Sequence, residues 1–137
     1  RNLNLLSDVA LMDEVKKTNE AIKEVIGTSP TLLRPPYGNL TDHGKELANM
    51  SIVLWNIDPL DWKYKDKNRV AQEIIEHAHD GAIILVHDIY KSSVEGALLA
   101  MEELQKQGYA FVTINEMAQL RGIKLDTTTS YFSMKKQ

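Results

Sequence analysis

The sequence predicts an α/β fold in which parallel strands alternate with helices along the chain. Segments with helical periodicity are separated by short apolar segments, and these are continuous apolar runs rather than alternating patterns. A continuous apolar run is typical of a strand buried on both faces, as in a parallel sheet covered by helices. The chain has 137 residues, of which 43% are hydrophobic, which is enough for one domain with its own core.

Two helices are predicted in the first half of the chain. Apolar residues recur at helical spacing between residues 15 and 26, and Gly27 is predicted to end this helix. Thr41 is predicted to cap a shorter helix that continues to about Asn49.

Three further helices are predicted in the second half. Asn68 is a suitable cap for the first of them, and Gly81 follows it as a stop signal. Ser92 and Glu95 have the spacing of a capping box at the start of the second. Asn115 is predicted to cap a last, short helix.

Four strands are predicted, at residues 31–33, 51–57, 82–86 and 109–113. The first runs into two consecutive prolines, which remove two backbone donors and fix the backbone, so a rigid loop is expected there. The residues after about 125 are polar and lack periodicity, so we expect a poorly ordered terminus.

Composition excludes several classes of function. The net charge is −3, with 16 basic and 19 acidic residues dispersed along the chain, so we expect no nucleic-acid partner. The absence of cysteine excludes thiolate nucleophiles, disulfides and cysteine-ligated zinc. No apolar run approaches the ~20 residues of a membrane-spanning helix, so we expect no membrane span in this chain. There is no Gly-x-Ser-x-Gly elbow and no Walker-type phosphate loop, which disfavours serine hydrolases and nucleotide binding.

Charged side chains follow the ends of the first three predicted strands. Arg34 follows the first strand, Asp58 and Asp61 the second, and His87 and Asp88 the third. Because the carboxyl ends of parallel strands meet at one edge of a sheet, we expect these groups on one rim. A histidine can transfer a proton near neutral pH, a carboxylate can orient it, and a guanidinium can bind a second carboxylate. The combination suits a hydrolytic reaction.

Structural explanations compete with this hypothesis. A single histidine at a strand end is more often structural than catalytic, Arg34 can be a surface ion-pair partner, and Asp58 can simply shape its turn. Aromatic side chains near the same rim favour a sugar ligand, because a flat apolar face packs against a sugar ring. These are Tyr37, Trp62 and Tyr90.

Three motifs together resemble those of a known family. They are Arg34-Pro35-Pro36-Tyr37-Gly38, Asp58-Pro59-Leu60-Asp61-Trp62 and Leu85-Val86-His87. In this order they resemble the third, fourth and fifth motifs of the polysaccharide deacetylases, carbohydrate esterase family four, also called the NodB-homology domain. The separations of 27 and 26 residues between Arg34, Asp61 and His87 are similar to those of streptococcal-type peptidoglycan N-acetylglucosamine deacetylases. The resemblance covers residues 1–122, and residues 123–137 are interpreted as a C-terminal tail.

The resemblance implies a distorted (β/α) barrel, of which this chain is expected to be the C-terminal part. It also implies an enzyme that hydrolyses the amide bond of an N-acetylated sugar. His87 is then the acid that protonates the departing amine, Asp61 the carboxylate that tunes it, and Arg34 the group that orients the catalytic base.

The same resemblance implies three substrate-binding residues. The backbone N–H of Tyr37 is expected to stabilise the oxyanion, and Trp62 and Leu85 are expected to form walls of the pocket that receives the acetyl methyl group.

The resemblance also implies a Zn²⁺ ion, or Co²⁺ or another divalent ion, in the complete domain. In the family the ligands come from the first two motifs, and neither motif is present here. His77 and His79 lie two residues apart on one helix and so point about 200° apart, and His43 is predicted to be exposed. We therefore expect no metal ligands in this chain, and expect it to need the N-terminal portion of the same catalytic domain, which can be a separate chain.

The leading hypothesis is a metal-dependent hydrolase that removes N-acetyl groups from N-acetylglucosamine residues of cell-wall peptidoglycan, with this chain incomplete by itself. Alternatives are a non-catalytic carbohydrate-binding remnant, or a deacetylase acting on chitin oligomers or acetylated xylan. A doubly wound signalling domain fits the alternation of elements but not the loop at residues 34–38. The resemblance further implies a glycan substrate and a location outside the cell or in the cell wall, with membrane anchoring through a segment N-terminal to this chain.

Overall fold

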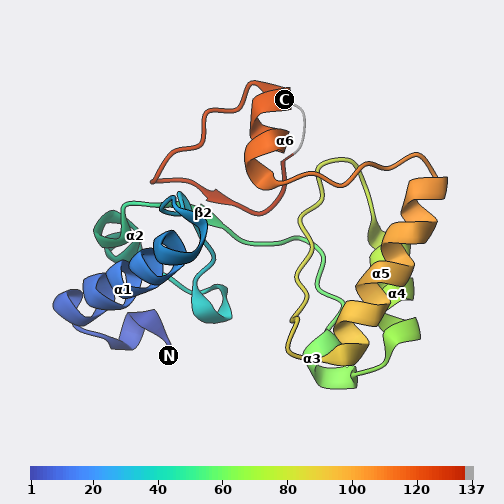
Figure 1. The fold of residues 1–137 in the computed structure, drawn as a ribbon, viewed down its shortest axis with the longest axis horizontal. Coiled ribbons are helices and arrows are strands. Elements are labelled where there is room, and N and C mark those ends of the chain that lie inside the picture. The colour runs from blue at the N-terminus through green and yellow to red at the C-terminus, as the bar shows by residue number, and fades with distance from the viewer. Residues whose placement is uncertain (135–137) are drawn as a thin grey trace. The chain divides into compact units, whose positions relative to one another are not determined.

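The computed structural model describes residues 1–134 of the chain, and Figure 1 labels its elements. The chain divides into two units. The first comprises Arg1–Leu54 and Leu125–Tyr131. The second comprises Trp55–Lys124 and the described residues that follow Tyr131. None of the helices formed by residues 1–134 is long and apolar enough to cross a bilayer.

The first unit begins with a short 3₁₀ helix (η1, Leu3–Leu5) followed by the long helix α1 (Asp8–Ile26). The Ser7 hydroxyl accepts a hydrogen bond from the backbone N–H of Ala10 and so caps the start of α1. Gly27 ends it in the left-handed region, with φ of 80°. The helix is confirmed, and it starts seven residues before the first apolar position used to predict it.

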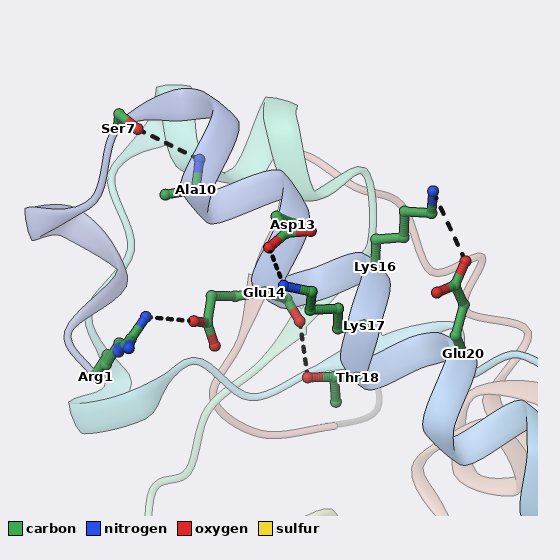
Figure 2. Close-up of polar contacts among 9 residues, drawn as sticks. All are labelled: Arg1, Ser7, Ala10, Asp13, Glu14, Lys16, Lys17, Thr18 and Glu20. Atoms are coloured by element: carbon green, nitrogen blue, oxygen red, sulfur yellow. Dashed lines mark hydrogen bonds and ion pairs between the residues drawn. The ribbon is translucent and has the colours of Figure 1, made fainter.

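Helix α1 carries several exposed polar side-chain contacts, as Figure 2 shows. Lys17 pairs with Asp13 and Lys16 with Glu20, each one helical turn apart. Exposed pairs at this spacing contribute only about 0.3–0.5 kcal/mol each to the stability of the helix.

The sheet of the first unit has three parallel strands in the order β1 (Leu32–Leu33), β2 (Ser51–Val53) and β3 (Ser130–Tyr131). Leu32 pairs with Ser51, and Ile52 pairs with Ser130. The central strand β2 is buried along its whole length, as its continuous apolar run predicts. The predicted first strand is confirmed, whereas the second ends at Val53 instead of continuing to residue 57.

Helix α2 (Asp42–Ala48) lies between the first two strands, and the predicted cap is confirmed. The Thr41 hydroxyl accepts from the N–H of Gly44, and Asn49 ends the helix in the left-handed region. A second 3₁₀ turn, η2 (Pro36–Gly38), contains the double proline.

The expectation of a poorly ordered terminus is wrong for the described part of it. Ser130–Tyr131 form strand β3, because Leu54 donates its backbone N–H to the carbonyl of Tyr131 and the strand thereby gains a partner. Met134 is also buried, with 1% of its surface exposed. Residues 135–137 lie outside the described residues.

The second unit contains four helices: α3 (Asp61–Tyr64), α4 (Lys67–His77), α5 (Lys91–Lys106) and α6 (Ile114–Arg121). Helix α4 is capped by Asp66, whose carboxylate accepts from two backbone N–H groups, and not by Asn68 as predicted. Tyr90 is at the cap position of α5 without a side-chain hydrogen bond, so the predicted capping box there is wrong.

The capping box of this unit is at α6. Thr113 caps the helix, and its hydroxyl and backbone exchange hydrogen bonds with Glu116. Asn115, the predicted cap, therefore lies inside the first turn. The pair satisfies two backbone donors at once, which a cap at Asn115 cannot do.

Two predicted strands do not form. Residues 82–86 make only isolated bridges, one parallel between Ile57 and Ile84 and one antiparallel between Ala82 and Ser133. Residues 109–113 form no strand within residues 1–134. A strand requires a neighbouring backbone that continues the ladder, and an apolar run alone does not supply one.

The core of the second unit lies between α4 and α5, which run side by side in Figure 1. Its buried members are Val70, Ala71, Ile74, Ala100 and Leu104. Gly96 allows this close packing, because a Cβ atom there would lie 2.7 Å from both the Lys67 carbonyl oxygen and the Val70 Cβ.

Replacing Gly96 by alanine is expected to destabilise the protein by about 1–3 kcal/mol, although alanine is the better helix former by roughly 1 kcal/mol. The added methyl group must push α4 away. Urea denaturation measures the change, and Leu98→Ala, at a position with 54% of its surface exposed, is the control on the same helix. A stabilised Gly96→Ala protein would contradict the packing.

Candidate active site

Asp61 and His87, which are 26 residues apart in sequence, are in direct contact in the second unit. The Asp61 side chain is fully buried, and one carboxylate oxygen lies 2.9 Å from His87 Nδ1. The other accepts a 2.7 Å hydrogen bond from the backbone N–H of His87. Because an ionised carboxylate can only accept hydrogen bonds, Nδ1 must carry the hydrogen. The Nε2 atom of His87 is then available to other partners, since 38% of the His87 side chain is exposed.

Opposing effects act on the pKa of Asp61. Burial is the largest and raises the pKa, whereas the Ser93 hydroxyl and the His87 amide and ring lower it. Together the lowering effects prevail, so the carboxyl titrates below its usual range and is ionised at neutral pH. Ser93 is fully buried, and its oxygen makes no hydrogen bond of regular geometry within residues 1–134.

Helix α3, which carries Asp61, is a single turn held between two residues in the left-handed region. Leu60 precedes it with φ of 50°, and Lys65 follows it with φ of 51°. Such conformations cost non-glycine residues on the order of 1 kcal/mol or more, and they persist where the surrounding contacts hold them. The Asp58 carboxylate accepts from the N–H of Leu60, at 2.9 Å, so Asp58 shapes this turn, in agreement with its structural explanation.

Two predicted substrate-binding residues belong to the same unit. Trp62 follows Asp61 on α3 and leaves 47% of its surface exposed. Leu85 is half-buried two residues before His87, and its N–H donates to the carbonyl of Ile57 at 3.0 Å. Their role as walls of an acetyl pocket stays a prediction.

Arg34 and Tyr37 belong to the first unit. The Arg34 guanidinium donates to the carbonyl oxygens of Val53 and Leu54, at 3.4 and 3.1 Å, and burial lowers its pKa from the ordinary value. Tyr37 has a left-handed backbone, with φ of 62°, and its side chain is largely exposed. Strained backbone of this kind is frequent where a loop presents its groups to a ligand. The assigned roles of both residues stay predictions.

Sequence reasoning missed Ser93. It lies in the first turn of α5 and is completely buried. Serine at such a position normally indicates helix capping, and only its contribution to the pKa of Asp61 distinguishes it. The sequence around Ser93 therefore gave no indication that Ser93 contributes to the site.

The described residues do not fit a metal site. Among residues 1–134, no group of three or more histidine, aspartate or glutamate side chains is arranged to hold an ion. His43 instead lies 3.0 Å from Asp8 on the surface of the first unit, and His79 contacts Asn56 at 2.8 Å in the second.

Comparison with known proteins identifies close relatives. The polysaccharide deacetylase family matches residues 1–52. PgdA of Listeria monocytogenes, a peptidoglycan-N-acetylglucosamine deacetylase, is 38% identical over 120 residues, which are 88% of this chain and 25% of PgdA. PdaC of Bacillus subtilis, a peptidoglycan-N-acetylmuramic acid deacetylase, is 34% identical over 119 residues, which are 87% of this chain and 26% of PdaC. The chain thus spans about a quarter of the length of these relatives.

Solved structures agree with the sequence relatives. The structure of PdaC matches with a TM-score of 0.86, covering 89% of this chain and 60% of that chain. A family 4 acetyl xylan esterase from Clostridium thermocellum, in complex with a cobalt ion, is 26% identical and matches with a TM-score of 0.87, covering 94% of this chain and 65% of that chain. The predicted α/β fold, part of a distorted (β/α) barrel, is confirmed.

The three motifs, the fold and the named relatives lead to one assignment. Two of the relatives are named as peptidoglycan deacetylases, and the solved esterase is a family 4 enzyme. This chain belongs to the polysaccharide deacetylase family, carbohydrate esterase family four.

Proposed function

We propose that this chain supplies the proton-donating part of a metal-dependent hydrolase that removes the N-acetyl group from N-acetylglucosamine in peptidoglycan. The observation that carries the proposal is the contact between the buried, ionised Asp61 and the half-exposed His87. Two hydrogen bonds to one carboxylate fix both the backbone and the ring of His87. An imidazole fixed in this way presents Nε2 in one direction, as a general acid requires.

The reaction cleaves a C–N amide bond, and the nitrogen must gain a proton before it can leave as an amine. His87 protonated on Nε2 donates that proton, and the Nδ1–H bond to Asp61 holds the ring during the transfer. The neutral ring that results keeps its hydrogen on Nδ1. Because part of the side chain is exposed, Nε2 can take a new proton from solvent for the next turnover.

The remaining predicted residues complete the proposal. Arg34 orients the catalytic base, Tyr37 donates its backbone N–H to the developing oxyanion, and Trp62 and Leu85 enclose the acetyl methyl group. The residues that hold the metal ion come from a segment N-terminal to this chain, and the protein acts outside the cell or in the cell wall. The family membership and the share of PgdA that this chain spans, 25%, support this division of roles.

N-Acetylglucosamine is the proposed substrate sugar because PgdA, named for that sugar, is 38% identical to this chain. The test uses the full-length protein that contains this chain. Incubated with peptidoglycan and with N-acetylglucosamine oligomers, it is expected to release acetate and leave free amines, and a metal chelator is expected to abolish both signals. Acetylated xylan serves as the competing substrate. Glycan binding without acetate release would instead indicate a non-catalytic carbohydrate-binding remnant.

A further inference from the structure

The segment directly after Asp61 is basic although the chain as a whole is acidic. Residues 62–69 read Trp-Lys-Tyr-Lys-Asp-Lys-Asn-Arg, with four cationic side chains and one carboxylate, whereas the chain has a net charge of −3. These residues form α3 and the start of α4. A positive surface in this place attracts an anionic ligand toward the Asp61–His87 pair.

Lys65 is tied to both partners of that pair. Its backbone N–H donates to the carbonyl of Asp61 at 3.0 Å and so ends α3. Its ammonium group lies 4.7 Å from the centre of the Tyr90 ring, and the Tyr90 N–H donates to the carbonyl of His87 at 3.3 Å. The ammonium group therefore lies beside the segments that carry Asp61 and His87.

The four cations of the segment differ in their partners. Lys67 pairs with Glu95 at 3.8 Å, and Arg69 with Glu73 at 3.9 Å. Within residues 1–134, Lys63 and Lys65 form no ion pair with a carboxylate and contact aromatic rings. Lys63 lies 5.0 Å from the centre of the Tyr64 ring, which the Arg69 guanidinium also contacts at 3.5 Å. A cation over an aromatic ring keeps its outward N–H groups available, so these two lysines can still bind an anion.

We propose that Lys63 and Lys65 form a subsite for a carboxylate of the glycan, and thereby select an anionic substrate over a neutral one. This inference rests on the proposed function and specifies its substrate class. Peptidoglycan offers two sources of the carboxylate: the lactyl group of N-acetylmuramic acid and the carboxyl groups of the stem peptide. Chitin oligomers offer none.

The experiment uses the full-length protein and measures kcat/KM for three substrates. They are chitotetraose, an N-acetylglucosamine–N-acetylmuramic acid tetrasaccharide with free lactyl carboxylates, and the same tetrasaccharide with stem peptides attached. Lys65→Asn removes the cation and keeps a residue that tolerates a positive φ. Lys63→Gln is the second variant, and Lys106→Gln, at the opposite end of α5 from Tyr90, is the matched control.

The wild-type protein is expected to prefer an anionic substrate, and the ratio of kcat/KM for anionic over neutral substrate is expected to fall about threefold in each variant and about tenfold in the double variant. The change should appear in KM rather than in kcat. Salt at ~1 M, where the screening length is about 3 Å, should remove the wild-type preference. Lys65→Arg should restore the ratio. The substrate that shows the loss identifies the source of the carboxylate.

Equal losses on neutral and anionic substrates would overturn the inference, because they would indicate a structural role for the two lysines. A ratio that neither variant changes, or that Lys106→Gln changes equally, would overturn it as well. If the wild-type protein releases no acetate from any substrate, the proposed function fails, and equilibrium binding of the three glycans then decides the inference. Weaker binding of the anionic tetrasaccharide by the double variant supports it, and unchanged binding overturns it.

Discussion

Replacing His87 by asparagine in the full-length protein is expected to lower kcat by about 10²–10⁴ while leaving glycan binding nearly unchanged. The asparagine side-chain N–H occupies the position of Nδ1 and can still donate to Asp61, which accepts from Nδ1 at 2.9 Å in the wild-type protein. The substitution therefore removes the proton donor at Nε2 and keeps the buried carboxylate satisfied. Steady-state kinetics on N-acetylglucosamine oligomers measure the effect, and calorimetric titration with the same glycan measures the binding.

His87→Ala is the informative comparison. It removes both the acid and the side-chain partner of a carboxylate that is completely buried, so it should lose activity and also lower the melting temperature. An asparagine variant that keeps more than about a tenth of the wild-type kcat would show that His87 is not the acid, since a lost general acid costs roughly 10²-fold or more.

The second large effect is expected for Asp61→Asn. The carboxylate accepts from both the backbone N–H and Nδ1 of His87, whereas an amide has one accepting oxygen and presents N–H groups at its other end. One donor of His87 must lose its acceptor or the ring must change its tautomer. We expect a loss of about 1–3 kcal/mol in the free energy of unfolding at pH 7 and a large loss of kcat.

The pH dependence of that stability loss tests the ionisation of Asp61. The pKa of Asp61 is held below its ordinary value of 3.8 in the folded protein, so folding stabilises the ionised form. This contribution is fully present above the ordinary value and disappears as the pH falls through the folded pKa. The difference in unfolding free energy between wild type and Asp61→Asn should therefore shrink on acidification from pH 7 to pH 3. A constant difference would contradict a lowered pKa.

The helices were the most predictable part of the fold, because their signals are local. The apolar periodicity before Gly27 and the cap at Thr41 each act within a few residues, and both are present in the structure. The exact caps of α4 and α6 were less predictable. Asn68 and Asn115 lie two residues after the actual caps, Asp66 and Thr113. The Asp66 side chain accepts from two backbone N–H groups, and Thr113 and Glu116 each accept from a backbone N–H of the other, so each cap satisfies two backbone donors.

The strands were less predictable, because a strand depends on a partner that is distant in sequence. Residues 82–86 and 109–113 have the apolar runs of buried strands, yet they form no continuous ladder in the described chain. Conversely, Ser130–Tyr131 have no strand pattern, and they form β3 because the edge of β2 offers its backbone groups. Whether these segments form strands therefore depends more on an available backbone partner than on their local composition.

The sequence by itself determined the α/β class through the alternation of helical and continuous apolar segments. The order and spacing of the three motifs determined the family and the candidate residues Asp61 and His87, because these depend on residue type and sequence separation. Only the tertiary structure decided that both oxygens of Asp61 bind His87, that Ser93 lies beside them, and that Lys65 contacts Tyr90. Burial and direct contact between distant segments depend on how the chain packs. A motif specifies which groups are present, and packing specifies which of them share a carboxylate.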